Sequence, residues 1–165
     1  MPTSELPAAL VADANAVLSA VIGGRASLAF GDSGLPPVYA ADAVRQEILE
    51  WLPKLATKRG LDLGLLLALF QLLPITWADE SRYRHREKEA HRRMRERDED
   101  DWPTVALALA LAESRSVAIW TNDKDFSVSG IDTVTTGELL DALRRTSRAY
   151  VVALRIRPRL RCSTV

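Results

Sequence analysis

The clearest fold signal is the stretch Val117-Ala118-Ile119-Trp120-Thr121-Asn122-Asp123-Lys124-Asp125-Phe126. Its first four residues are apolar, as in a buried strand, and they lead directly into a polar turn. A similar pattern lies near the start of the chain, where the apolar run over residues 8–12 ends at Asp13. Because the carboxyl ends of parallel strands meet at one edge of a sheet, Asp13 and Asp123 are expected to face the same cleft.

Short apolar runs alternate with helical patterns along the rest of the chain. Further strands are predicted over residues 38–41, 74–77 and 132–135, and another over 151–156. Helices are predicted from Asp13 to Gly23, from the capping residue Asp42, over 62–72, over an alanine- and leucine-rich segment at 105–112, and from the capping residue Thr136. This alternation predicts βαβ units and an α/β fold with a mainly parallel sheet.

Composition limits the class of protein. The 165 residues suit one domain, and Lys plus Arg equals Asp plus Glu at 22 each, which excludes a uniformly basic polycation. The single cysteine, Cys162, excludes an intrachain disulfide and a cysteine-built zinc site, and it fits a reducing compartment. The N-terminal stretch lacks a basic region, and the apolar segment 63–73 is shorter than the roughly 20 residues of a membrane span. We therefore expect a cytoplasmic protein without a membrane segment.

Charge is concentrated between residues 79 and 101. This segment predicts a solvated helix with a thin apolar stripe of Tyr83, Ala90 and Met94. Its arginines, with Arg25 and Lys124, are candidates for phosphate contacts, although a plain surface helix is the favoured explanation for most of the arginines. His85 and His91 are expected to be exposed and not catalytic. The basic tail over 150–165 has no assigned role, which leaves one domain over 1–149.

Two further acidic positions accompany Asp13 and Asp123. Glu47 is predicted near the apolar edge of its helix, whereas Glu50 falls nearly opposite the buried face. The run 98–101 precedes the alanine- and leucine-rich helix. Each acid alone is most simply a cap, turn or surface residue, but their joint placement favours a site. Carboxylates in one cleft repel each other and bind a cation, and an all-oxygen set selects Mg²⁺ or Mn²⁺, which suits phosphodiester cleavage.

The segments around Asp13, Glu47, 98–103 and 119–126 match, in order and spacing from about Leu10 to Leu143, those of a known family. The chain resembles the PIN-domain family of VapC-like, metal-dependent ribonucleases. The resemblance implies a three-layer α/β/α sandwich with about five strands and a central acidic cleft, over residues 1–149. It also implies metal-binding and catalytic carboxylates at Asp13, Glu47, Asp101 and Asp123, with Asp98 or Asp100 as alternatives to Asp101. Asp125 would be a supporting acid that also binds metal. The polar residues that would orient the acids or the metal-bound water are Asn15, Ser19 and Thr121. For Ser19, local capping is an equal explanation.

The resemblance further implies an endoribonuclease that uses Mg²⁺ or Mn²⁺ and binds RNA. It suggests the toxin of a toxin–antitoxin pair, with an antitoxin over the cleft, and a homodimer, which the apolar segment 63–73 also favours. The arginine-rich segment and the basic tail depart from a minimal toxin. A dehalogenase-like phosphatase is disfavoured because Asn15 stands where that chemistry needs a second acid. A catalytically inactive PIN-like module that binds RNA or a partner remains the alternative.

Overall fold

The sheet has the predicted parallel arrangement. The computed structural model describes residues 6–95 and 99–156, and its strands are β1 (Ala9–Ala12), β2 (Val38–Ala41), β3 (Ile75–Ala78), β4 (Val117–Trp120) and β5 (Thr133–Val134). They form one sheet in the order β3-β2-β1-β4-β5, with every neighbouring pair parallel. The carboxyl ends of β1 and β4 are neighbours, since Ala12 pairs with Trp120. Asp13 and Thr121 therefore leave the sheet side by side.

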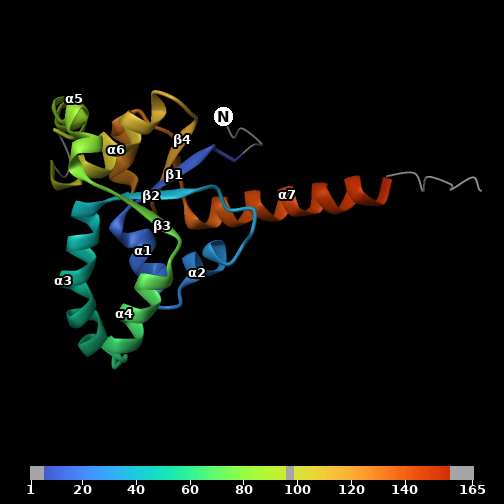
Figure 1. Ribbon diagram of the computed structural model, residues 1–165, viewed down its shortest axis with the longest axis horizontal. Helices are drawn as coiled ribbons and strands as arrows, with labels where there is room; N and C mark the ends of the chain where they lie inside the picture. The colour runs from blue at the N-terminus through green and yellow to red at the C-terminus, as the bar shows by residue number, and fades with distance from the viewer. Residues whose placement is uncertain (1–5, 96–98, 157–165) are drawn as a thin grey trace, which may run out of the picture.

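Helices cover both faces of the sheet (Figure 1). On one face α6 (Trp102–Ala112) packs on the central strands and carries α5 (Glu87–Met94) outside it. On the other face lie α1 (Ala14–Val21), α2 (Arg25–Phe30), α3 (Asp42–Arg59), α4 (Leu63–Leu72) and the first turns of α7 (Thr136–Ile156). Short 3₁₀ turns fill the links: η1 (Glu80–Arg82), η2 (Arg84–Arg86), η3 (Glu99–Asp101) and η4 (Lys124–Ser129). The expected three-layer sandwich is thus confirmed.

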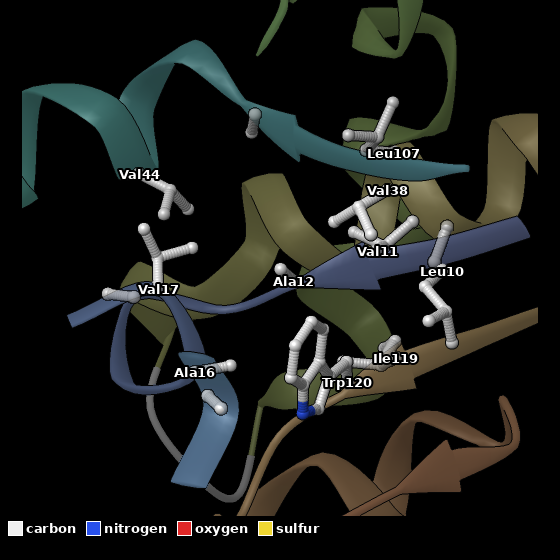
Figure 2. Close-up of a cluster of buried hydrophobic side chains, with 14 of the residues drawn as sticks. Leu10, Val11, Ala12, Ala16, Val17, Val38, Val44, Leu107, Ile119 and Trp120 are labelled. Atoms are coloured by element: carbon white, nitrogen blue, oxygen red, sulfur yellow. The ribbon is translucent and has the colours of Figure 1, made fainter. Parts of the chain in front are cut away.

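The core sits between the central strands and the helices on either side. Figure 2 shows Val11 of β1 and Val38 of β2 near Leu107 of α6, while Val17 of α1 and Val44 of α3 meet at the end of the sheet. All four residues of β1 are fully buried, as are Ile119 and Trp120 of β4. Strands buried on both faces read as continuous apolar runs, which explains why these two segments carried the fold signal.

Several local signals place the element boundaries. Asp62 caps α4 by accepting a 2.7 Å hydrogen bond from the Leu65 amide. Gly60 ends α3 with φ +64°, a left-handed conformation that glycine adopts without strain. At the start of α7 a capping box forms, because the Glu138 amide donates to Thr135 Oγ1 and the Thr135 amide donates to the Glu138 carboxylate. The predicted cap at Thr136 was therefore wrong by one residue, as was that at Asp42, which is the first residue of α3.

Three expectations about the elements were also wrong. Residues 151–156 are not a strand but the last turns of α7, because a helix already formed extends more easily than an isolated strand can pair. The charged segment is not one long helix but two 3₁₀ turns followed by the eight-residue α5. Its predicted apolar stripe is nevertheless correct, since Tyr83, Ala90 and Met94 are all buried. Helix α2, anchored by buried Ala26 and Ala29, was not predicted.

The last helix, α7, leads out of the sandwich toward the C-terminus. The first turns of α7 are anchored by Leu139, Leu140 and Leu143, and the helix then extends away from the layers (Figure 1). It continues through the proposed domain boundary at residue 149, which stays a prediction, and residues 157–165 of the basic tail lie outside the described part.

Among the helices in the described residues, none is long and apolar enough to cross a lipid bilayer.

Candidate active site

Asp13 stands at the junction between β1 and α1 and is 4% exposed. Its Oδ1 accepts a 2.7 Å hydrogen bond from the Ala16 amide, so it caps α1. Its Oδ2 accepts a 2.5 Å hydrogen bond from the Thr121 hydroxyl, which follows β4. Both carboxylate oxygens are thus fixed by groups from two elements, and the capping explanation and a site residue are compatible at this position.

The environment of Asp13 disfavours its charge. Burial is the largest cause and raises the pKa of this carboxyl group from 3.8 to about 6, although the hydrogen bonds from Thr121 and Ala16 act in the opposite direction. The negative charges of Asp123 and Glu47 raise the pKa further. A carboxyl group held in this way has a strong tendency to acquire a proton or a cation.

The Thr121 hydroxyl joins Asp13 to the turn that carries Asp123. It donates to Asp13 and accepts a 2.9 Å hydrogen bond from the Asp123 amide. Asp123 in turn caps η4, because its Oδ1 accepts a 2.9 Å hydrogen bond from the Asp125 amide. Asp125 is half-buried in the first turn of η4. The predicted role of Thr121 as an orienting residue therefore has a direct structural counterpart in these two hydrogen bonds.

Two predicted residues meet Asp123 at the surface. Asn15 of α1 and Lys124 of η4 line a shallow, open depression together with Asn122 and Asp123. Asn15 follows Asp13 by two residues and is exposed, so the depression lies directly beside the buried carboxyl group. The structure thus gathers an acid, two amides and one ammonium group at the carboxyl edge of the sheet, a combination suited to a ligand with phosphate and polar groups.

Glu47 lies on the second turn of α3 and is exposed. It is close enough for its charge to raise the pKa of Asp13, as was expected of a residue facing the cleft. Glu50 is also exposed. The sequence placed Glu47 near the apolar edge of its helix but did not predict that the residue is exposed, and its role in the site stays a prediction.

The other predicted residues lie on neighbouring elements. Asp101 ends η3 directly before α6, Asp100 precedes it, and both make polar interactions, while Asp98 is outside the described residues. Ser19 is half-buried near the end of α1, where a Cβ on Gly24 would lie 2.6 Å from its hydroxyl. Arg25 begins α2 and is exposed. Over residues 6–95 and 99–156, no three acidic, histidine or cysteine side chains lie close enough together to form a ready-made metal site.

Sequence reasoning missed a second set of polar contacts behind the site. Thr136 Oγ1 accepts hydrogen bonds from Trp120 Nε1 at 3.0 Å and from Asn122 Nδ2 at 3.5 Å. The Asn122 Oδ1 atom accepts a 3.2 Å hydrogen bond from the Thr136 amide. These bonds tie the turn after β4 to the start of α7. The capping pattern Thr135-Thr136-Gly137-Glu138 marks the helix start in the sequence, but the partner residue Asn122 is not deducible from it.

Comparison with protein families identifies the domain. A family model for the PIN domain matches residues 11–144, which is most of the chain and includes every predicted site residue. No curated protein matches the sequence.

Proposed function

The chain belongs to the PIN domain family, and from this membership we propose that it is a divalent-metal-dependent endoribonuclease. Proteins of this family are generally nucleases, which supports a ribonuclease-like activity. The observation that carries the proposal is Asp13, a buried carboxyl group at the end of β1 whose pKa is raised to about 6 by burial and by two neighbouring acids. Perturbed carboxyl groups at such a sheet edge are typical of functional sites.

The donor set fits a hard divalent cation. Asp13, Asp123 and Glu47 offer only oxygen atoms, and their mutual repulsion is relieved by Mg²⁺ or Mn²⁺. Asp101, with Asp98 or Asp100 as alternatives, and Asp125 would complete the set. When bound, the ion lowers the pKa of a water molecule and neutralises charge on the phosphodiester. Exposed Asp123 and Glu47 have side chains that can turn toward Asp13, whose own position is fixed by Ala16 and Thr121.

The chain's own residues would divide the remaining work. Thr121 holds Asp13 in one orientation and, through the Asp123 amide, keeps the following turn against it. An ionised carboxylate has about four acceptor positions, so Asp13 can hold its two donors and an ion together. Lys124 lines the same depression as Asp123, where its ammonium group is placed to bind a phosphate oxygen beside the acids.

A cleavage assay tests this proposal. The full chain is incubated with a mixture of structured and unstructured RNAs in Mn²⁺ or Mg²⁺, with and without EDTA. Cleavage is expected only with the metal, and Asp13→Asn and Asp123→Asn should abolish it while circular dichroism shows a folded protein. The matched control is Asp141→Asn, which removes an exposed acid of α7. Equal cleavage by wild type and both site variants, or cleavage that EDTA does not affect, would refute the proposal.

A non-catalytic module that binds RNA or a partner is the second candidate. The observation that favours it is that the described residues contain no preassembled metal site. Calorimetric titration with Mn²⁺ separates the two proposals, because an inactive module would show no saturable binding whereas the nuclease would bind the ion through Asp13. In the second case Asp13→Asn should remove the binding heat.

Self-association and a toxin role are finer parts of the proposal. Leu65, Leu69 and Leu72 lie on one exposed side of α4, at 58%, 40% and 78% exposure, which supports a homodimer through this face. Sedimentation that shows only an 18.2 kDa species at micromolar concentration would contradict the dimer. A toxin function in the cytoplasm predicts that expression of the wild type slows bacterial growth and that expression of Asp13→Asn does not. An antitoxin partner should copurify with the chain and cover the cleft.

A further inference from the structure

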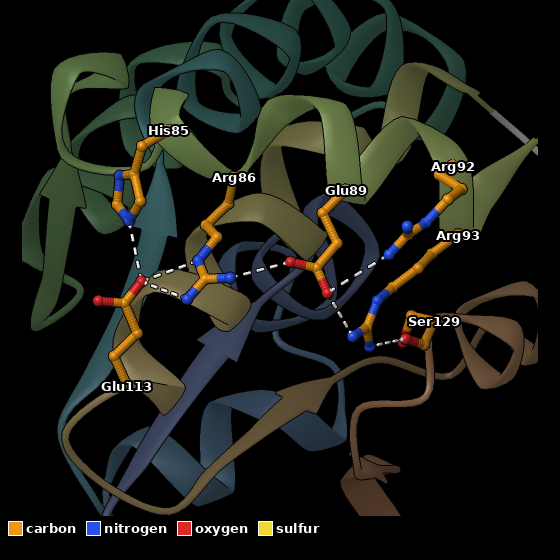
Figure 3. Close-up of polar contacts among 7 residues, drawn as sticks. All are labelled: His85, Arg86, Glu89, Arg92, Arg93, Glu113 and Ser129. Carbon is orange, nitrogen blue, oxygen red and sulfur yellow. Dashed lines mark hydrogen bonds and ion pairs between the residues drawn. The ribbon is translucent and has the colours of Figure 1, made fainter.

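Helix α5 has three distinct faces. Ala90 and Met94 face the core and are fully buried. A second face carries Arg86, Glu89 and Arg93, which form a network of ion pairs (Figure 3). The third face carries Lys88, His91, Arg92 and Arg95, spaced at i, i+3, i+4 and i+7, so that they share one side of the helix. We call these four residues the cationic face.

The ion-pair network uses the acids of its own side. Glu89 receives hydrogen bonds from Arg86 at 2.9 Å and from Arg93 at 2.6 Å, and Glu113, which caps the end of α6, receives two further contacts from Arg86 at 2.8 Å. These acids and arginines therefore hold each other in position, and their charges are used in pairing with one another. Arg93 also donates to the Ser129 carbonyl, which ties α5 to the end of η4.

The cationic face is left with excess positive charge. Within the described residues, no ion pair involves Lys88 or Arg95, and Arg92 only reaches Glu89 at 4.0 Å. Lys88, Arg92 and Arg95 are exposed and, with His91 and Glu87, line a depression. Three permanent cations thus line this depression with one carboxylate, that of Glu87, while Glu89 is paired mainly with Arg86 and Arg93. Lys88 and Arg95 are seven residues apart, about 10 Å along the helix, so the cationic face is long enough to contact more than one phosphate of a single strand.

The cationic face adjoins the start of α6 through an aromatic contact. The His91 ring stacks on Trp102, with centroids 5.2 Å apart and planes at 29°. His91 is half-buried, so the prediction that it is exposed was wrong. Trp102 is the first residue of α6 and follows Asp101 directly. An extended polyanion lying along Lys88, Arg92 and Arg95 would therefore pass near Asp100 and Asp101 of η3, which are candidates for the metal site.

We propose that the cationic face of α5 binds the phosphate backbone of single-stranded RNA and guides it toward the acids that precede α6. This inference rests on the proposed nuclease function and assigns the binding surface for its substrate. Exposed cations with few acidic neighbours bind a polyanion by releasing its counterions, and they read no base sequence. The zero net charge of the chain is compatible with this surface, because phosphate contacts depend on the charges that face the ligand and not on the sum over the chain.

Binding without cleavage tests the surface. A fluorescent unstructured 12-nucleotide RNA is titrated in EDTA with the full chain and with the triple variant Lys88→Gln, Arg92→Gln, Arg95→Gln, and anisotropy is followed at several salt concentrations. Glutamine is a good helix former, so α5 should remain folded. Affinity at low salt should fall at least tenfold. The slope of log affinity against log salt should decrease by about 2, since each single-strand phosphate contact contributes about 0.7.

The matched control removes three exposed arginines of α7 by Arg144→Gln, Arg145→Gln, Arg148→Gln. This control should retain the wild-type affinity and slope. An equal loss in both triple variants, or no loss in the α5 variant, overturns the inference even if the wild type cleaves RNA normally. Weaker binding by the α5 variant alone, without cleavage by wild type in Mn²⁺, supports the surface and contradicts the nuclease. Absence of RNA binding by the wild type overturns the surface proposal outright.

Discussion

Replacing Asp13 by asparagine should stabilise the protein at pH 8 but not at pH 4. In the folded chain the pKa of this carboxyl group is raised from 3.8 to about 6, mainly by burial. Between these values the folded state binds more protons than the unfolded state, so the free energy of unfolding falls as pH rises through the window. Below pH 3.8 the group is protonated in both states and the effect is absent. Above pH 6 the full loss of folding stability is present.

The magnitude follows from the size of the shift. A rise of about two pKa units corresponds to about 3 kcal/mol of lost stability at pH 8, since one unit is about 1.4 kcal/mol. Asparagine carries no charge at either pH and removes this loss. Its amide nitrogen cannot accept the hydrogen bond that Thr121 donates to Asp13, which costs about 1 kcal/mol at both pH values. We therefore expect a net gain of about 2 kcal/mol at pH 8 and a small loss at pH 4.

Urea unfolding followed by circular dichroism in EDTA measures both quantities. The quantity to compare is the change in the free energy of unfolding that Asp13→Asn causes at pH 4 and at pH 8. The cost of the lost hydrogen bond is the same at both pH values and cancels in the difference, which we expect to be about 2 kcal/mol. Asp141→Asn, at an exposed position of α7, is the control and should show no such change. If Asp13→Asn shifts stability by the same amount at both pH values, the carboxyl group is not disfavoured by burial and the reasoning is wrong.

Three further predictions concern the same edge of the sheet. Saturating Mn²⁺ at pH 8 should raise the Tm of wild type by about 4–8 °C, from about 2 kcal/mol of binding energy, and that of Asp13→Asn by much less in a melting assay. Thr121→Val should lower stability by about 2–3 kcal/mol in urea and abolish cleavage, because it leaves Asp13 and the Asp123 amide without their shared partner, whereas Thr121→Ser should retain both properties. Arg93→Gln should release the Ser129 carbonyl, and hydrogen exchange should then be faster over 124–130 than in the control Arg84→Gln.

The sequence predicted the sheet well because its central strands are buried on both faces. Runs such as 117–120 and 38–41 have no polar residue to interrupt them, and their observed bounds match the predicted ones. The acids at the strand ends were predictable for a related reason. Parallel order alone brings Asp13 and the turn after β4 to one edge, and Ala12 does pair with Trp120.

Features that depend on contacts between distant segments were not predictable. The bond from Arg93 to the Ser129 carbonyl joins residues 36 positions apart, and no periodicity marks it. The segment 79–95 has a strong helical charge pattern, yet buried Tyr83 sits between two 3₁₀ turns, so packing decided the backbone there. At 151–156 the β-branched residues favoured a strand, but continuation of α7 decided the structure. Local preference decides an element only where no neighbouring contact opposes it.

The instability expected at Asp13 and the proposed metal site have the same physical origin. Burial and the charges of Asp123 and Glu47 disfavour the carboxylate in the folded chain, and a cation removes the same cost when it binds. The loss of about 3 kcal/mol at pH 8 is therefore also the most that ion binding can recover from this one group. That amount corresponds to about a hundredfold in affinity. Proton binding competes for the same carboxylate below pH 6, so Mn²⁺ affinity should fall about tenfold for each pH unit below that value in calorimetric titrations. A pH-independent affinity between pH 5 and pH 6 would separate the two effects and place the ion away from Asp13.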